Sequence, residues 1–120
     1  MNRIVHFEFH EPDVNKALKF YADVFGWKSQ RFAGPQEYHL LFTGDGKGID
    51  GGMMPSRDGQ PHTFNTIQVQ DVDQATAKVI EHTGSICVPK MAIPGVGWLV
   101  YCKDPGGVIF GMMHEDKEAK

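Results

Sequence analysis

The N-terminal segment of the chain carries three side chains that could take part in acid–base or binding chemistry. His6, Glu8 and His10 stand at alternate positions, with Phe7 and Phe9 between them. Alternation of this kind predicts a β-strand that has one apolar face and one polar face. Imidazole and carboxylate groups on a single face can orient a ligand or move a proton near neutral pH.

Two interpretations of this polar face are open. In the first, His6, Glu8 and His10 line a cavity and contact a small molecule there. In the second, His6 is a hydrogen-bonded histidine without a catalytic role, and the other two lie near a solvent-exposed rim. Polar groups that face a cavity need hydrogen-bond partners. We therefore expect ligand contact at this strand, and we do not expect catalysis by it.

The elements that position these residues occur twice along the chain. Asp13 corresponds to Asp71 and Gly26 to Gly84, at a constant shift that also aligns His6 with Phe64. Both copies end in the tripeptide Gly-Met-Met, which occupies 52–54 and 111–113. A repeat of this length indicates two copies of one supersecondary unit.

Each copy has the hydrophobic pattern of a strand, a helix and three further strands. In the first copy the expected strands are 3–10, 27–32, 38–43 and 49–54, and the helix runs from Pro12–Asp13 to Gly26. In the second they are 63–69, 85–91, 98–103 and 108–113, with a helix from Val72 that Gly84 closes. We expect a single domain over 1–120, with repeats at about 3–56 and 63–114 and a linker at about 57–62.

Composition excludes several classes of protein. The chain has 120 residues, 41% of them hydrophobic and 22% charged, which is ordinary for a globular domain. The formal net charge is −3 and no basic stripe is present, so nucleic acid is not an expected partner. No apolar run has membrane-spanning length and no signal peptide is visible, so we expect a cytoplasmic location with no membrane partner. Cys87 and Cys102 are expected to be free thiols.

Several stretches of the chain are similar to a known superfamily. The most informative of these stretches are residues 19–27, 69–75 and 104–111. The last of them has the sequence Asp-Pro-Gly-Gly-Val-Ile-Phe-Gly. With the two β-α-β-β-β copies, they resemble the vicinal oxygen chelate superfamily, which includes glyoxalase I, bleomycin-resistance proteins, extradiol dioxygenases and methylmalonyl-CoA epimerase. The segment 89–98 looks like that of small, mostly uncharacterised relatives of lactoylglutathione lyase.

The resemblance implies an α+β fold in which the two repeats form a U-shaped eight-stranded mixed sheet, with helices on its convex side and a cup inside. Metal-using members hold one divalent ion in that cup, with histidine, glutamine or glutamate ligands from the first and last strands of each copy. The ion binds two neighbouring oxygens of the substrate and stabilises an oxyanion or enolate.

The ligand positions of this chain do not match that pattern. His6 stands at the first position, but the equivalent positions hold Phe64, Gly52 and Gly111. Glycine has no side chain and phenylalanine cannot bind a hard cation. We therefore predict no divalent metal and no other cofactor. An alternative stays open in which His62, two residues before Phe64 and on the same strand face, or Glu8 completes a metal site with His6.

The predicted cup is apolar apart from its first strand. Aromatic side chains and methionines suit an adaptable pocket, although Tyr38, Phe64, Phe110 and Trp98 could equally be core residues. Within each methionine pair we expect Met53 and Met112 in the core. The predicted ligand-binding residues are His6, Glu8, Met54, Phe64, Thr66, Trp98 and Met113.

The function expected from the sequence is metal-independent binding of a small molecule that the sequence does not identify. The alternative is a lyase, isomerase or oxygenase that acts on a small oxygenated substrate, with Glu8 or His6 as the base. A homodimer is expected because members of the resembling superfamily often pair.

Overall fold

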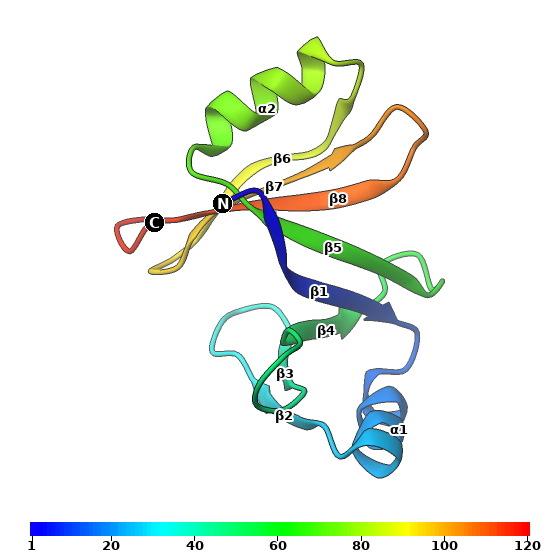
Figure 1. The fold of residues 1–120 in the computed structure, drawn as a ribbon. Coiled ribbons are helices and arrows are strands. Elements are labelled where there is room, and N and C mark those ends of the chain that lie inside the picture. Colours follow the sequence, from blue (N-terminus) through cyan, green and yellow to red (C-terminus); the bar gives the residue numbers. More distant parts are fainter. The chain divides into compact units, whose positions relative to one another are not determined.

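The computed structural model describes residues 1–120, which form eight strands and two helices in two compact units (Figure 1). The first unit is His6–Phe64. The second unit is Asn65–Lys120 together with Met1–Val5, so the first strand of the chain begins in the second unit. Each unit contains one copy of the β-α-β-β-β order that the repeat predicts, and this confirms the α+β repeat fold.

The first copy consists of β1 (Arg3–Glu11), α1 (Val14–Phe25), β2 (Lys28–Arg31), β3 (His39–Phe42) and β4 (Gly51–Pro55). Its strands are ordered β2-β3-β4-β1. The β1–β4 pair is parallel, and the other two pairs are antiparallel. The register places Glu8 opposite Gly52 and His10 opposite Met54.

The second copy consists of β5 (His62–Gln68), α2 (Val72–Glu81), β6 (Ser85–Ile93), β7 (Gly97–Lys103) and β8 (Ile109–Glu115). Its strands are ordered β5-β8-β7-β6, again with one parallel pair, β5–β8. The equivalent strands of the two copies therefore pair in the same order.

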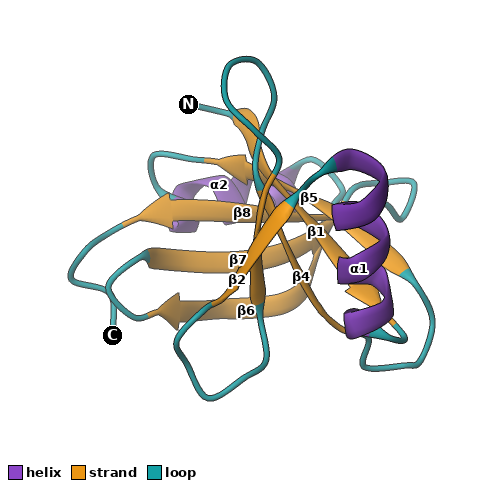
Figure 2. Ribbon diagram, turned by 90° about the horizontal axis from the view of Figure 1, so that it is seen from below, coloured by secondary structure: helices purple, strands orange, loops and turns teal.

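Helix α1 begins and ends at residues that the sequence marks. The Asp13 side chain accepts a hydrogen bond from the Lys16 backbone N–H at 3.1 Å, which caps the first turn. Gly26 has φ of 74° and its N–H donates to Ala22 O, the left-handed conformation that glycine adopts without strain. One face of the helix packs on the sheet of the first unit (Figure 2).

The core of the first unit lies between α1 and this sheet. Val14 from α1, Leu41 from β3 and Met53 from β4 are at most 7% exposed. Phe7 and Phe9 of β1 pack against them. Since side chains alternate along a strand, the odd-numbered residues of β1 face α1, and His6, Glu8 and His10 lie on the opposite face. The expected core position of Met53 is confirmed.

Helix α2 has a similar beginning and a different end. Asp71 accepts hydrogen bonds from the backbone N–H groups of Asp73 and Gln74. At the other end the C-cap is His82, and Thr83, not Gly84, takes the positive φ of 72°. Gly84 still takes part in the helix end, because its N–H donates to Val79 O at 2.8 Å, and a Cβ there would lie 2.6 Å from Val79 Cγ1.

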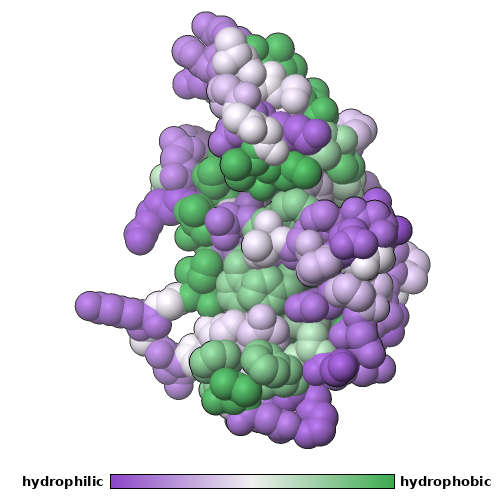
Figure 3. Space-filling model, turned by 90° about the vertical axis from the view of Figure 1, so that its right-hand side faces the viewer, coloured by the Kyte–Doolittle hydropathy of each residue, from purple (hydrophilic) through white to green (hydrophobic).

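The core of the second unit contains Val69, Val72, Val100, Cys102 and Met112, all buried between α2 and the strands. The expected core position of Met112 is thus confirmed. Both cysteines are free thiols, as expected. Some apolar side chains stay at the surface, visible as green areas in Figure 3, and no helix is long and apolar enough to cross a membrane.

Candidate functional site

Four side chains of the first unit form a continuous chain of hydrogen bonds, here called the polar network. His6 Nε2 lies 2.8 Å from Tyr38 Oη, and Tyr38 Oη donates to Glu8 Oε1 at 3.1 Å. Glu8 Oε2 lies 2.7 Å from His10 Nε2. The network joins the three polar residues of β1 through a tyrosine that directly precedes β3.

The hydrogen bonds assign the protons of this network. Tyr38 gives its hydroxyl hydrogen to Glu8, so it accepts a hydrogen from His6 Nε2. His6 is then the tautomer whose Nδ1 carries the lone pair. Burial lowers the pKa of His6, and the nearby carboxylates of Glu8 and Asp50 oppose this shift only in part. The His6 imidazole is therefore neutral at neutral pH.

Glu8 is the most buried member of the network, with only 5% of its surface exposed. A buried carboxylate is costly unless it is hydrogen-bonded. Each of its oxygens has a partner, Tyr38 on one and His10 on the other. This arrangement fixes the Glu8 carboxyl group, through hydrogen bonds on both oxygens, at one place on the strand face opposite α1.

Gly52 makes room for the tyrosine. An added Cβ at residue 52 would lie 1.9 Å from Tyr38 Oη and 2.3 Å from Cζ. No larger residue can therefore stand at this position while Tyr38 keeps its place. In the sequence, glycine at this position counted as the loss of a metal-ligand side chain. In the structure, the phenol of Tyr38 occupies the space where such a side chain would lie.

Phe64, Met54 and His62 lie around the His10 end of the network. The Phe64 ring meets His10 edge-on, with 4.8 Å between ring centroids. Met54 stands opposite His10 in the β1–β4 register. His62 stacks on Phe64 at 6.0 Å, but its Nε2 lies 2.8 Å from Asp58 Oδ2.

His62, the first residue of β5, thus pairs with Asp58 of the preceding turn rather than with His6. Asp58 also accepts hydrogen bonds from the Gln60 backbone N–H and from Ser56 Oγ. The pKa of Asp58 therefore lies well below its usual range. The hydrogen bond from the Gln60 backbone is the largest cause, and the bonds from His62 and Ser56 add to it. The contacts of His62 therefore give no support to a metal site shared with His6.

In the second unit, Thr66 and Met113 lie on the strand face opposite α2. Thr66 is buried, and the β5–β8 register places it beside Gly111. A Cβ at Gly111 would lie 3.2 Å from Thr66 Oγ1, a tight approach. Met113 stands opposite Leu99 and is half-buried.

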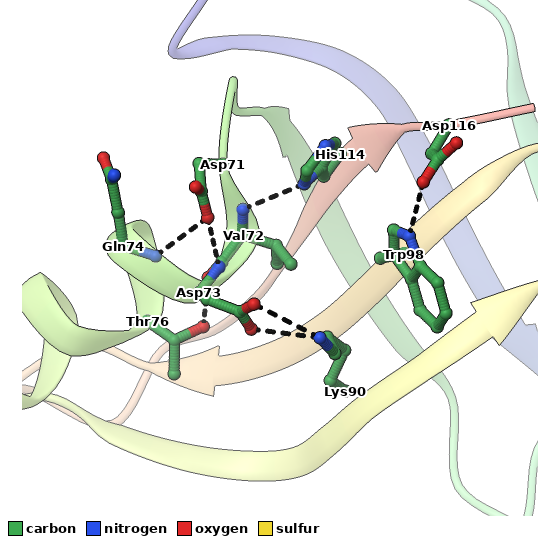
Figure 4. Close-up of polar contacts among 9 residues, drawn as sticks. All are labelled: Asp71, Val72, Asp73, Gln74, Thr76, Lys90, Trp98, His114 and Asp116. Carbon is green, nitrogen blue, oxygen red and sulfur yellow. Dashed lines mark hydrogen bonds and ion pairs between the residues drawn. The ribbon is translucent and has the colours of Figure 1, made fainter. Parts of the chain in front are cut away.

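Trp98 does not share that face. It packs against the core cluster that contains Val100 and Cys102, on the side of the strands that carries α2. Figure 4 shows its indole Nε1 directed at Asp116, to which it donates at 3.0 Å. Lys90 Nζ lies 5.0 Å from the ring centroid. The structure therefore separates Trp98 from Thr66 and Met113, with which the sequence grouped it.

The residues present do not fit the divalent ion that the resemblance implies. The positions of Gly52, Phe64 and Gly111 supply no donor atom, and Tyr38 fills the space beside Gly52. His6 is the only one of the four expected ligand positions that has a donor atom, and its Nε2 is hydrogen-bonded to Tyr38 Oη at 2.8 Å. No group of three or more His, Cys, Asp or Glu side chains is arranged to hold a metal ion.

Comparison with known proteins assigns the family. A model of the Glyoxalase/Bleomycin resistance protein/Dioxygenase superfamily matches residues 3–112. The chain belongs to this superfamily. No curated protein matches the sequence.

Solved structures of the superfamily fold are similar over nearly the whole chain. Methylmalonyl-CoA epimerase from Mycobacterium tuberculosis has a TM-score of 0.74 at 14% identity, covering 94% of this chain and 87% of that one. A variant of the Streptomyces coelicolor epimerase, in complex with 2-nitronate-propionyl-CoA, gives 0.71 at 15%, covering 100% and 99%. A superfamily member from Vibrio splendidus gives 0.68 at 18%, covering 95% and 98%. At these identities the likeness establishes the fold alone.

Sequence reasoning placed His6 and Glu8 together correctly but did not find Tyr38 as their partner. Tyr38 was grouped with apolar pocket or core residues, because an isolated aromatic before a strand carries no signal of hydrogen bonding. The available signal was Gly52, whose missing side chain in a paired strand indicates that another group approaches closely.

Proposed function

We propose that the protein binds a small molecule at the polar network without a divalent metal. The observation that carries this proposal is the position of Tyr38, whose hydroxyl stands beside Gly52 and bonds both His6 and Glu8. A hydrogen-bonded phenol, imidazole and carboxylate offer donors and acceptors to a ligand in place of a Lewis acid.

The comparison with solved structures supports a small-molecule ligand. The Streptomyces coelicolor epimerase of similar fold is described in complex with 2-nitronate-propionyl-CoA. The fold is therefore one in which an organic ligand has been seen. The apolar residues near the His10 end of the network, Phe64 and Met54, would contact the non-polar part of such a ligand.

The test is a fragment screen by NMR on protein with ¹³C-labelled histidines, dialysed against EDTA. We expect fragments that shift the His6 and His10 ring signals, with unchanged affinity when EDTA is present. His6→Gln should abolish these shifts. His82→Gln is the matched control, because His82 is the exposed C-cap residue of α2 in the second unit, and it should leave them intact. A screen without such fragments, or binding that appears only after Mn²⁺ or Co²⁺ is added, would contradict the proposal.

A second candidate function is proton transfer on a small oxygenated substrate, as in a lyase or isomerase. The neutral His6 imidazole, linked through Tyr38 to the Glu8 carboxylate, favours it, because both are potential bases. Fragments that bind can be incubated in D₂O with the protein. Deuterium incorporation that depends on His6 would identify an enzyme, and binding without exchange would leave a binding protein. A cytoplasmic homodimer stays our expectation for the assembly.

A further inference from the structure

We propose that Cys87 and Cys102 form a reversible disulfide across strands β6 and β7, with a low-molecular-weight disulfide such as oxidised glutathione as the oxidant. The structure shows the reduced form, in which both thiols are free. Both residues belong to the second unit, so this inference does not rest on the polar network or on a ligand bound there.

The strand register brings the two cysteines close together. β6 and β7 pair antiparallel, and Ile86 stands opposite Cys102. Tyr101, the neighbour of Cys102 in β7, stands opposite Val88, so Cys87 is the extra residue of a bulge between these two pairs. Opposite residues of antiparallel strands have Cα atoms about 4.5–5.5 Å apart, and disulfides join Cα atoms about 4.4–6.8 Å apart. The register therefore places the two cysteines at a separation of the order that a disulfide spans.

The bulge also affects the direction of the Cys87 side chain. In a regular strand the side chains of Ile86 and Cys87 point to opposite faces, so Cys87 would point away from Cys102. A bulge interrupts this alternation and re-aims a side chain of its strand. β6 is the last strand in the sheet order and has no strand on its outer side, so its backbone is free to adjust when a bond to β7 forms.

The two thiols differ in exposure, and this difference assigns their roles. Cys87 is exposed on the edge strand β6, which lies beside β7 (Figure 1), whereas Cys102 is fully buried in the core cluster that contains Val72 of α2. Burial raises the pKa of the Cys102 thiol, and the nearby Cys87 thiol adds to this effect. Since the thiolate is the reacting form, Cys87 attacks the external disulfide and Cys102 completes the exchange.

The exchange proceeds in two balanced steps. In the first, the Cys87 thiolate bonds to one sulfur of oxidised glutathione, and the other glutathione leaves as a thiolate. In the second, Cys102 loses its proton and attacks Sγ of Cys87, so that the bond between Cys87 and glutathione breaks and the second glutathione leaves. Two protein thiols are oxidised, and one external disulfide is reduced to two thiols.

The disulfide would fasten the edge of the second unit. It closes a loop over residues 87–102, which contains the end of β6, the turn into β7 and the contact between Lys90 and the Trp98 ring. A cross-link of this kind restricts the unfolded chain, so the oxidised protein should be more stable than the reduced protein.

Mass spectrometry of the native full-length chain tests the bond. Reduced protein is incubated with oxidised glutathione at mildly alkaline pH, quenched with acid and digested without reductant. We expect the protein to lose two hydrogen atoms and to yield a cross-linked pair of peptides that contain Cys87 and Cys102. Dithiothreitol should restore both thiols. The urea midpoint of the oxidised protein should lie above that of the reduced protein.

Single-cysteine variants separate the two steps. Cys102→Ala should stop at the mixed disulfide, with glutathione on Cys87, and oxidation should then produce no stabilisation by an internal cross-link. Cys87→Ala should react at least about ten-fold more slowly, because only the buried thiol remains. The wild-type measurement needs no variant, so it decides the proposal even where a substitution in the core impairs folding.

Three results would overturn the proposal. In the first, wild-type protein keeps both thiols, or carries glutathione on Cys87 and never closes the internal bond. In the second, the disulfide joins two copies of the chain instead of two positions of one chain. In the third, the internal bond forms only after urea has unfolded the protein, which would show that the native register does not bring the two sulfur atoms together.

Discussion

At the scale of single residues, the decisive pair is Gly52 and Tyr38. Glycine removes a side chain from β4, and the phenol of Tyr38 takes the space that this leaves. The hydroxyl then bonds to His6 and Glu8, which lie on the neighbouring strand. One small residue thus permits a polar network, and in that network Tyr38 donates a hydrogen bond to Oε1 of the buried Glu8 carboxyl group.

The pair makes a prediction for a double-mutant cycle. Tyr38→Phe leaves Glu8 without one donor, so we expect a loss of about 1–3 kcal/mol in the free energy of unfolding. Gly52→Ala should displace the tyrosine and cost a similar amount, because the new Cβ would overlap its hydroxyl. In a Tyr38→Ala background the same Gly52→Ala change should cost much less, since the overlap is gone.

Urea unfolding of the four proteins in the cycle measures this coupling. Tyr21→Phe is the matched control, because the Tyr21 ring stacks on Trp27 and Phe9 through its face, and removal of its hydroxyl leaves these contacts intact. Equal costs of Gly52→Ala in the presence and absence of Tyr38 would show that Gly52 is required for a different reason.

At the scale of elements, the two helices begin at equivalent aspartates that are used to different extents. Asp13 accepts one backbone N–H in α1, whereas Asp71 accepts two in α2. Helix α2 is also hydrogen-bonded to β8, because the Val72 N–H donates to Nδ1 of His114 at 3.2 Å. Lys90 of β6 also pairs with Asp73 at 3.2 Å (Figure 4).

We therefore expect Asp71→Ala to destabilise the protein more than Asp13→Ala. Loss of an N-cap side chain costs about 0.5–2 kcal/mol, and the larger value belongs to the cap that satisfies more donors. The two substitutions are matched by chemistry and by position in the repeat. Thermal or urea unfolding compares them directly, and equal losses would show that the second hydrogen bond of Asp71 contributes nothing.

At the scale of the whole molecule, the two copies keep the same strand order and helix positions but carry different chemistry. From residue 6 onward, the even-numbered residues of β1 are His6, Glu8 and His10, and the counterparts of the first two in β5 are Phe64 and Thr66. The polar network belongs to the first copy alone. In the second copy, a polar contact lies instead on the side of the strands that carries α2, where Trp98 Nε1 donates a hydrogen bond to Asp116.

The buried His6 links this network to the stability of the whole protein. Its pKa is lowered in the folded state, so the unfolded chain takes up a proton more readily. The contribution of His6 to stability is then present above the unfolded pKa of about 6.5 and declines as pH falls through that value toward the lower folded pKa.

Urea unfolding at about pH 8 and about pH 5.5 brackets this range. We expect wild type to lose more stability between the two conditions than His6→Gln, which has no proton to gain. His82→Gln, at the exposed C-cap of α2, should behave as wild type does. The same pH dependence in wild type and His6→Gln would mean that His6 is not neutralised by burial.

The sequence by itself determined the repeat, the order of the elements, the helix start at Asp13 and the shared face of His6, Glu8 and His10. These features follow from local periodicity and capping, which act over a few residues. Only the tertiary structure decided that Tyr38 fills the space at Gly52, that Trp98 lies on the α2 side, and that His62 pairs with Asp58. Those contacts depend on register and on side-chain packing between segments far apart in sequence, and no local pattern encodes them.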